Sequence, residues 1–193
     1  MSTRPRLDHD QVIATAEAIV DRDGWQALTM TALAKELGVK VPSLYNHVPN
    51  LEALRGELQC STLREIGERL NRKAMGRTGE TAMRAMAETY REYAKAHPGR
   101  YDLATQAPVD DDAIAEAATA AGAALHAVIR SYGIEEEALE LQLSTFAALH
   151  GVLVLENAGF FPDFVDTDPI FETVLGLVLD LLERHAPSEA RAS

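Results

Sequence analysis

The chain has 193 residues, a formal net charge of −12 and one cysteine. This length allows one or two domains with a substantial buried core. The single cysteine, Cys60, excludes an internal disulfide framework and a metal site built from several cysteines, so a reducing cytoplasm is the expected setting. The acidic balance excludes a nucleic-acid binder that is basic over its whole surface.

The first predicted helix covers residues 10–21 and ends at Asp23–Gly24, because its apolar residues recur at helical spacing. Before it, Arg4 and Arg6 form a polar arm that either reaches DNA phosphates and the minor groove or is a frayed, soluble terminus. The residues from Met1 to Asp10 are polar and do not resemble a signal segment.

The stretch from Thr29 to Val48 is the most informative part of the chain. Thr29 or Thr31 can cap a helix, Gly38 can end it in a left-handed conformation, and Pro42 suits the first turn of a second helix. Two short helices joined by a glycine turn form a unit that fits the major groove of DNA.

The second of these helices is predicted to bury Leu44 and Val48 and to expose its polar side chains. No acidic residue occurs from Leu37 to Leu51, although the chain as a whole is acidic. A surface that meets phosphates should lack carboxylates, so this segment is the predicted DNA-binding surface. In contrast, residues 101–193 hold 17 acidic and three basic residues and would face away from the duplex.

Further helices are predicted downstream, and no strand alternation is present, so the predicted fold is all-α. The predicted domains are a helix-turn-helix domain over residues 1–50, a helical regulatory and dimerisation domain over residues 51–186, and a disordered tail over residues 187–193. The expected helices of the second domain are 50–73, 78–97, 110–132, 135–159 and 169–185. The most apolar run, Val174–Leu182, is too short to span a bilayer, so no membrane partner is expected.

The last two predicted helices each carry two adjacent apolar seams, which is wider than one intrachain contact needs. We expect one seam of each helix to pack in its own subunit and the other against a second copy, in a four-helix homodimer interface. The alternative is a helix buried centrally in a monomer. The seam assigned to the partner consists of Leu141, Ala148, Val152, Leu155, Phe171, Leu175, Val178 and Leu182.

A pocket for a small, mostly hydrophobic effector is expected in the second domain, because adaptable methionines and a few polar groups are predicted to face inward. Close packing of the alanine-rich helix at 113–127 is the alternative. The candidate pocket residues are Met83, Met86, Tyr90, Tyr93, His126, Phe146 and His150.

The segment GWQALTMTALAKELGVKVPSLYNHVPNLEAL resembles the DNA-binding domain of the TetR family of bacterial transcriptional regulators, and AALHGVLVLENAGFF at 147–161 resembles the C-terminal domain of one TetR subgroup. The resemblance implies a homodimer with one helix-turn-helix per subunit and an effector pocket. At Leu51 this chain departs from the family, whose members often carry lysine there, and Arg55 lies one turn further on. The DNA contacts that the resemblance implies are Thr31, Lys40, Val41, Pro42, Ser43, Tyr45 and His47.

Within this set, Thr31, Tyr45 and His47 are expected to bind phosphates, and the residues from Lys40 to Ser43 to meet base edges. The Tyr45 ring could pack in the core with only its hydroxyl exposed, which is compatible with a phosphate contact, and the His47 imidazole could instead cap helix carbonyls. The predicted function is a sequence-specific repressor that binds a palindromic operator and is released by its effector. No catalytic residue, cofactor or metal is predicted. A helical interaction protein and a small enzyme are the alternatives, although phosphate-loop, GxSxG and CxxC motifs are absent from the sequence.

Overall fold

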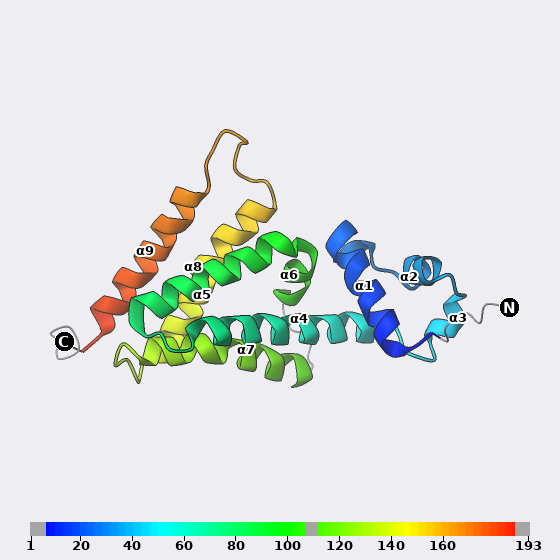
Figure 1. Cartoon of the computed structure of the whole chain (residues 1–193), viewed down its shortest axis with the longest axis horizontal. Coiled ribbons are helices and arrows are strands. Elements are labelled where there is room, and N and C mark those ends of the chain that lie inside the picture. The colour runs from blue at the N-terminus through cyan, green and yellow to red at the C-terminus, as the bar shows by residue number, and fades with distance from the viewer. Residues whose placement is uncertain (1–6, 107–111, 188–193) are drawn as a thin grey trace. The chain divides into compact units, whose positions relative to one another are not determined.

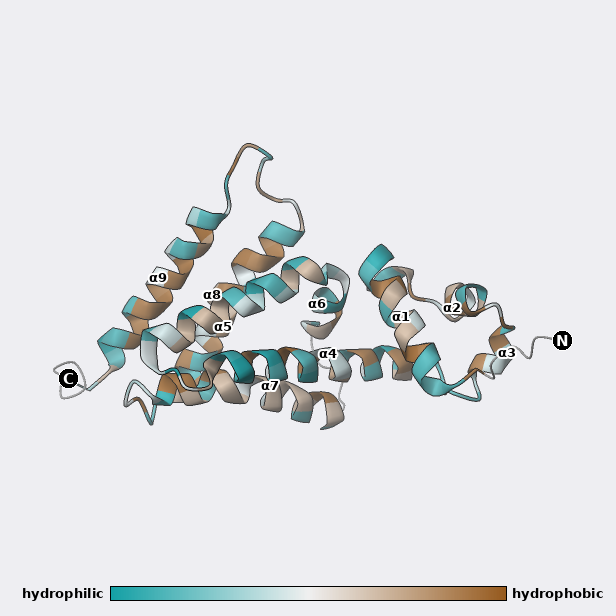
Figure 2. Cartoon of the chain, viewed as in Figure 1, coloured by the Kyte–Doolittle hydropathy of each residue, from teal (hydrophilic) through white to brown (hydrophobic). Residues whose placement is uncertain are grey.

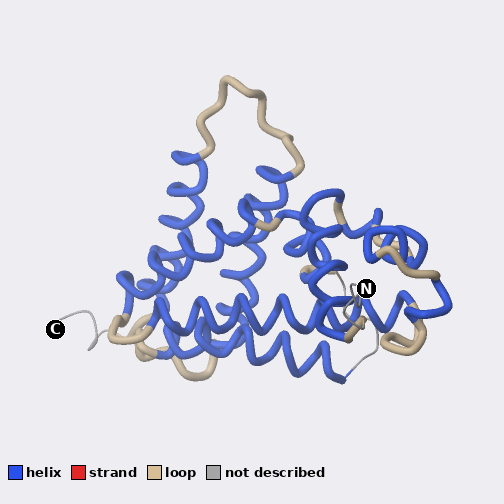
Figure 3. The backbone as a smooth tube through the Cα atoms, turned by 45° about the vertical axis from the view of Figure 1, so that its right-hand side comes forward, coloured by secondary structure: helices blue, strands red, loops and turns tan. Residues whose placement is uncertain are grey.

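The structure is a computed structural model that describes residues 7–106 and 112–187. The described residues are helical or irregular and include no strand (Figure 3), which confirms the predicted all-α fold. The predicted arm at Arg4 and Arg6 lies outside the described residues, and so does the predicted tail over residues 187–193 except for Pro187. The helices of Figure 1 are α1 (His9–Asp23), η1 (Trp25–Ala27), α2 (Met30–Leu37), α3 (Val41–Leu44), α4 (Leu51–Ala74), α5 (Gly79–Ala96), α6 (Pro98–Ala104), α7 (Asp112–Arg130), α8 (Ala138–Asn157) and α9 (Asp168–His185).

These helices form two compact units, and the chain crosses between them more than once. Unit 1 consists of residues 1–63 and 97–115, and unit 2 of residues 64–96 and 116–193. The helix α4 therefore contributes its first half to unit 1 and its second half to unit 2, and α6 belongs to unit 1. These boundaries differ from the predicted division at residue 50, which placed all of α4 and α6 in the second domain.

Unit 1 has a core built from one face of each of its helices. The side chain of Asp8 accepts a hydrogen bond from the backbone N–H of Gln11 and starts α1 with a capping box. Asn50 caps α4 with a single hydrogen bond, in which its side-chain oxygen accepts from the N–H of Ala53 at 2.7 Å. The buried side chains of this core include Val12, Ile19, Leu28, Leu33, Leu44, Val48, Leu54, Leu58 and Leu103.

The helix α6 was not predicted: the helix expected over residues 78–97 is followed by Pro98–Gly99, a pair that usually ends a helix, and the next helix was expected only at residue 110. Proline is instead tolerated in the first turn of α6. A Cβ at Gly99 would stand 2.9 Å from the carbonyl carbon of Val20 in α1, and closer still to its oxygen. Glycine is therefore what allows α6 to approach α1 this closely.

Unit 2 is a helical bundle in which α8 packs against α5 and α9. Arg91 of α5 holds the two ends of the α8–α9 loop. Its guanidinium bonds the carboxylate of Glu156 near the end of α8 and the hydroxyl of Thr167 before α9, at 3.2 Å, and pairs with Asp168 at 2.8 Å. Burial alone would raise the pKa of the Glu156 carboxyl, but its bonds with Arg91 and Thr167 outweigh this and lower it.

The helix α8 is apolar on all sides, which distinguishes it from an ordinary surface helix. It and α7 are long and apolar enough to cross a bilayer, although core helices of soluble proteins pass the same test. The buried side of α8 carries Leu141, Thr145, Leu149, Val152 and Leu153. Figure 2 shows that α8 and α9 are hydrophobic along much of their length, so part of this apolar surface lies outside the core of unit 2.

Candidate nucleic-acid interface

The helix-turn-helix is built as the sequence predicted. The hydroxyl of Thr29, not that of Thr31, accepts a hydrogen bond from the N–H of Ala32 at 3.1 Å and caps α2. Gly38 ends α2 in the left-handed conformation, with φ of 67°. Pro42 lies in the first turn of α3, which is only four residues long and continues as hydrogen-bonded turns to Val48.

The expected DNA contacts share the outer side of this segment, whereas Leu44 and Val48 are buried as predicted. Thr31, Lys40, Pro42 and Tyr45 are exposed, and Val41, Ser43 and His47 are partly exposed. Tyr45 is 53% exposed, so it is not a core residue. The structure thus gathers all seven residues in one segment, and their contacts with DNA remain a prediction.

His9 is a residue of this region that sequence reasoning missed. Its Nε2 lies 2.6 Å from Oε1 of Glu57 in α4, and its Nδ1 lies 3.2 Å from the backbone carbonyl of His47. The hydrogen bond with Glu57 is the main cause that raises the pKa of His9, and partial burial opposes it. No nearby sequence signal identifies this contact, because His9 precedes its partners by 38 and 48 residues.

At position 51, where the family often carries lysine, this chain has a leucine that contributes to packing. Leu51 lies against the apolar core of unit 1. Arg55, one turn further on, donates a hydrogen bond to the carbonyl of Leu28 at 3.1 Å and stacks over the ring of Trp25, 5.1 Å from its centre. This start of α4 therefore contributes mainly to the fold of unit 1.

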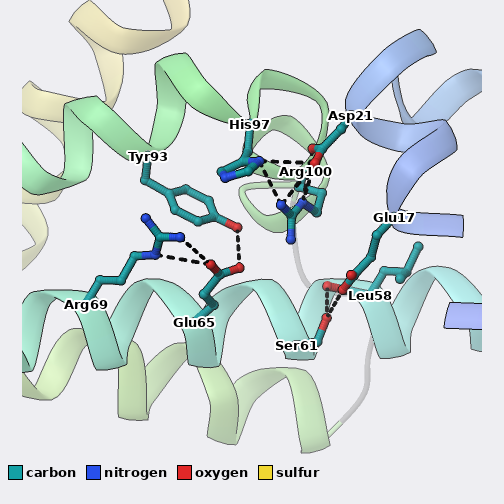
Figure 4. Close-up of polar contacts among 9 residues, drawn as sticks. All are labelled: Glu17, Asp21, Leu58, Ser61, Glu65, Arg69, Tyr93, His97 and Arg100. Carbon is teal, nitrogen blue, oxygen red and sulfur yellow. Dashed lines mark hydrogen bonds and ion pairs between the residues drawn. The ribbon is translucent and has the colours of Figure 1, made fainter. Parts of the chain in front are cut away.

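A second group of polar contacts holds α6 to the rest of unit 1. The Asp21 carboxylate of α1 accepts hydrogen bonds at 3.0 Å from Arg100 and lies 3.1 Å from Nδ1 of His97 (Figure 4). The indole N–H of Trp25 donates to Asp102 of α6 at 2.7 Å. The helix-turn-helix unit is thus connected by side chains to a helix that begins directly after α5.

The expected effector residues do not share one environment in unit 2, since those of α5 are buried whereas Phe146 is 41% exposed. Met83, Met86, Tyr90 and Tyr93 are buried side chains of α5, and the Tyr93 hydroxyl donates to Glu65, which also binds Arg69 (Figure 4). Phe146 stacks on His150 with ring centres 5.3 Å apart and lies 6.4 Å from the Tyr90 ring. His126 instead bonds Gln142 at 3.0 Å.

Thr145 is an inward-facing polar residue of α8 that sequence reasoning also missed. It is completely buried, and its hydroxyl has no hydrogen-bond partner among residues 7–106 and 112–187. A buried hydroxyl without a partner is costly and is a place where a ligand can supply the missing hydrogen bond. No sequence pattern indicates this role, because the hydroxyl of a threonine in an apolar helix is commonly bonded to the backbone of its own helix.

A cavity of about 630 Å³ opens in another part of unit 2 and includes none of the predicted effector residues. Tyr132 lines this cavity, and the pKa of its hydroxyl is raised to about 12. Burial is the largest cause, and the nearby carboxylates of Glu80 and Glu183 raise it further. Within the described ranges, no group of three or more histidine, cysteine, aspartate or glutamate side chains could hold a metal ion.

The predicted dimer seam requires a correction. Six of its eight residues are buried within the chain itself, and only Ala148 and Leu155 are exposed. The six buried residues cannot supply contact area to a second copy, because the subunit's own core already covers them. They are Leu141, Val152, Phe171, Leu175, Val178 and Leu182. The exposed large apolar side chains of α8 and α9 are instead Leu139, Leu143, Phe146, Val154, Leu155 and Leu177.

A capped helix, a left-handed glycine and a short exposed helix without acidic residues define unit 1 as the DNA-binding domain of a helix-turn-helix regulator. Residues 12–58 match the family model for bacterial regulatory proteins of the tetR family, and residues 83–178 match the tetracyclin repressor-like C-terminal domain. The chain is 39% identical over 191 residues to Rv0681 of Mycobacterium tuberculosis, described as an uncharacterized HTH-type transcriptional regulator, with 97% of this chain and 87% of the relative covered. The chain therefore belongs to the TetR family, whose members are intracellular DNA-binding transcriptional regulators and not enzymes.

Solved structures share the fold across both units. The crystal structure of BioQ with its double-stranded DNA operator matches with a TM-score of 0.70 and 22% identity, covering 93% of this chain and 100% of that chain. A TetR variant from Acinetobacter baumannii AYE in complex with minocycline matches with a TM-score of 0.72 and 20% identity, covering 95% of this chain and 100% of that one. At these identities the likeness shows the fold alone.

Proposed function

We propose that this regulator binds a palindromic DNA operator as a homodimer in the cytoplasm and represses transcription until a small hydrophobic effector releases it. The observation that carries the proposal is the largely exposed segment from Lys40 to His47, which contains no acidic residue. The buried side chains of Leu44 and Val48 hold this segment to the core of unit 1. Lys40 can donate to guanine acceptors in the major groove, and Thr31, Tyr45 and His47 can bond phosphates.

DNA binding can be tested without knowing the operator. Fragments selected by the protein from a random double-stranded library would serve as probes for Lys40→Ala and Tyr45→Ala. Loss of one base or phosphate contact should cost about 1–3 kcal/mol of binding free energy. Lys73→Ala is the matched control, because Lys73 is an exposed lysine at the end of α4 in unit 2. Unchanged affinity of both variants would show that the recognition segment is assigned wrongly.

The dimer is proposed from the exposed apolar face of α8 and α9. Leu143 and Leu177 are 57% and 61% exposed in a single subunit, and a helix that is apolar on all sides needs a second partner. Two such helices from each subunit would form a self-complementary four-helix interface. Two recognition segments could then reach major grooves one helical turn of DNA apart.

Sedimentation at micromolar concentration tests this interface. The wild-type chain should sediment as a dimer, and Leu177→Glu should sediment as a monomer, because a carboxylate would be buried in the interface. Met75→Glu is the matched control, since Met75 is an exposed apolar residue outside α8 and α9. A monomeric wild type, or a dimeric Leu177→Glu variant, would contradict the proposed interface.

The effector site is proposed in the interior of unit 2, next to α5 and α8. Methionine and tyrosine side chains provide an adaptable apolar lining there, and the Thr145 hydroxyl provides an unused hydrogen-bonding group. An effector that binds better to a conformation with a different spacing of the two DNA-binding units would weaken operator binding by that difference in affinity.

Thermal-shift screening with aromatic and lipid-like compounds tests the site. A compound that stabilises the protein should also lower its affinity for the selected DNA. Thr145→Val should raise the stability of the free protein by about 1 kcal/mol, because it removes a buried unpaired hydroxyl, and should reduce the stabilisation by a compound that bonds this group. A melting temperature unmoved by the whole library would contradict the proposed pocket.

A further inference from the structure

His9 joins three parts of unit 1 that lie far apart in the sequence. It is the first residue of α1, its Nε2 lies 2.6 Å from a carboxylate oxygen of Glu57 in α4, and its Nδ1 lies 3.2 Å from the carbonyl oxygen of His47. The His47 carbonyl belongs to the turn that follows α3, so this contact connects α1 to the end of the recognition segment.

The chemistry of the two partners determines the protonation state that this arrangement favours. A carboxylate and a backbone carbonyl can only accept hydrogen bonds, whereas neutral imidazole has a single N–H to donate. Only the imidazolium form, with both ring nitrogens protonated, satisfies both contacts at once. Either neutral tautomer leaves one of the two acceptors without a hydrogen bond.

We propose that His9, as an imidazolium, is a positioning residue for DNA recognition that fixes the end of the recognition segment and neutralises Glu57. The proposal rests on the DNA-binding function proposed above. The helix α3 has only four residues, so its own backbone hydrogen bonds do little to fix its direction. The positively charged His9 ring donates to the His47 carbonyl in the turn that follows α3, which is electrostatically favourable. This adds a hydrogen bond to the packing that the buried side chains of Leu44 and Val48 provide.

The charge of Glu57 gives His9 a second effect on DNA binding. The segment from Leu37 to Leu51 contains no acidic residue, but His9 connects it to the carboxylate of Glu57, whose side chain is 43% exposed. Among residues 7–106 and 112–187, the charged groups that act on His9 are Glu57 of α4 and Asp10 of its own helix, and His47 contributes its carbonyl. The imidazolium balances one of these negative charges, which would otherwise repel phosphates.

Proton binding and DNA binding should therefore favour each other. Below the pKa of His9, both hydrogen bonds form and Glu57 is neutralised. As the pH rises through this pKa, one hydrogen bond is lost and the local charge falls by one, so affinity for DNA decreases. If DNA raises the pKa of His9 by one unit, affinity falls about tenfold per subunit over the whole titration.

The test uses the full-length protein and a double-stranded DNA fragment that the protein selects from a random library. The dissociation constant is measured between pH 5.5 and 8.5 for the wild type, His9→Gln and Glu57→Gln. The wild type should lose affinity as the pH rises, and both variants should lose most of this dependence. His185→Gln is the matched control: His185 also lies between a backbone carbonyl, that of Leu181, and a carboxylate, that of Glu137, but it belongs to unit 2 and not to the DNA-binding segment, so this variant should keep the dependence on His9.

NMR titration of the His9 ring in the free protein gives a readout that does not require DNA. The pKa should lie above the ordinary value for histidine in the wild type and fall in Glu57→Gln. An unshifted His9, or a His9→Gln variant with the same pH dependence of DNA affinity as the wild type, would overturn this inference and leave the proposed function intact. Failure of the folded wild type to bind any selected fragment at any pH would overturn both.

Discussion

Replacement of Gly99 by alanine should disrupt the packing of α6 against α1. The added Cβ would lie 2.9 Å from the carbonyl carbon of Val20 and 3.4 Å from the Cα of Gly24. Both neighbours are backbone atoms, so no flexible side chain can move aside. The two helices must separate, and Leu103, which α6 contributes to the core of unit 1 and which is 4% exposed, would lose part of its packing.

The expected cost follows from these contacts. Insertion of a methyl group into a closely packed contact costs about 1–3 kcal/mol, and complete exposure of a buried leucine would cost about 1.5–3 kcal/mol. We therefore expect Gly99→Ala to lower the free energy of unfolding of unit 1 by about 2–4 kcal/mol. For a chain of this size, that corresponds to a fall in melting temperature of roughly 5–15 °C.

The single tryptophan supplies a local assay. Trp25 donates its indole N–H to Asp102 of α6, so separation of α6 should change the tryptophan emission before global unfolding. Gly56→Ala is the matched control, because the nearest atom to its Cβ would be the flexible tip of Ile114 at 3.8 Å. It should be neutral or stabilise α4 by up to about 1 kcal/mol. A Gly99→Ala variant with wild-type stability and emission would refute the reasoning.

Two further predictions concern the buried ion pair of unit 2. Arg91→Met should lower the free energy of unfolding by up to about 3–5 kcal/mol in urea denaturation, because it removes the guanidinium that bonds the carboxylate of Glu156, 4% exposed, and leaves it with the longer ion pair to Lys95 at 3.6 Å. Arg91→Met combined with Glu156→Leu should recover most of this loss, and a double variant no more stable than the single one would contradict the explanation. Because the folded pKa of Glu156 is lowered, its contribution is present above the ordinary carboxyl pKa and is lost as the pH falls through the folded value. Denaturation measured from pH 6 to pH 3.5 should therefore show a smaller loss of stability in Glu156→Gln than in the wild type.

The helices and caps of the recognition segment were predictable because their signals are local. Gly38 and Pro42 act within one turn of their own position, and the structure confirms both. The same local reasoning failed at Pro98–Gly99, where a pair of residues that usually ends a helix begins one. The reason lies in the contact of Gly99 with Val20, a residue 79 positions earlier, which no local pattern reveals.

The face of α8 and α9 that packs in the subunit could not be predicted for a different reason. Each helix carries two seams of similar hydrophobicity, so spacing identifies both seams but gives no preference between them. Leu175 and Leu177 are equally apolar, yet the first is completely buried and the second largely exposed. Which seam is buried depends on the side chains that neighbouring helices pack against it, and these contacts are defined only by the tertiary structure.

His9 and Thr145 were missed because their significance depends on partners, present or lacking, that only the folded chain defines. His9 gains its role from two acceptors brought to it by α4 and the turn after α3. Thr145 is notable because no described residue satisfies its hydroxyl.

The division of α4 and the return of the chain to unit 1 at residue 97 have a practical consequence for anyone who wishes to isolate the DNA-binding part. A fragment that stops after residue 63 contains every residue expected to contact DNA, but lacks Leu103 of the core and the Asp102 acceptor of Trp25. Such a truncation would expose apolar surface that the intact chain covers. A circularly permuted or linker-joined version that keeps residues 97–115 beside residues 1–63 is the fragment expected to fold.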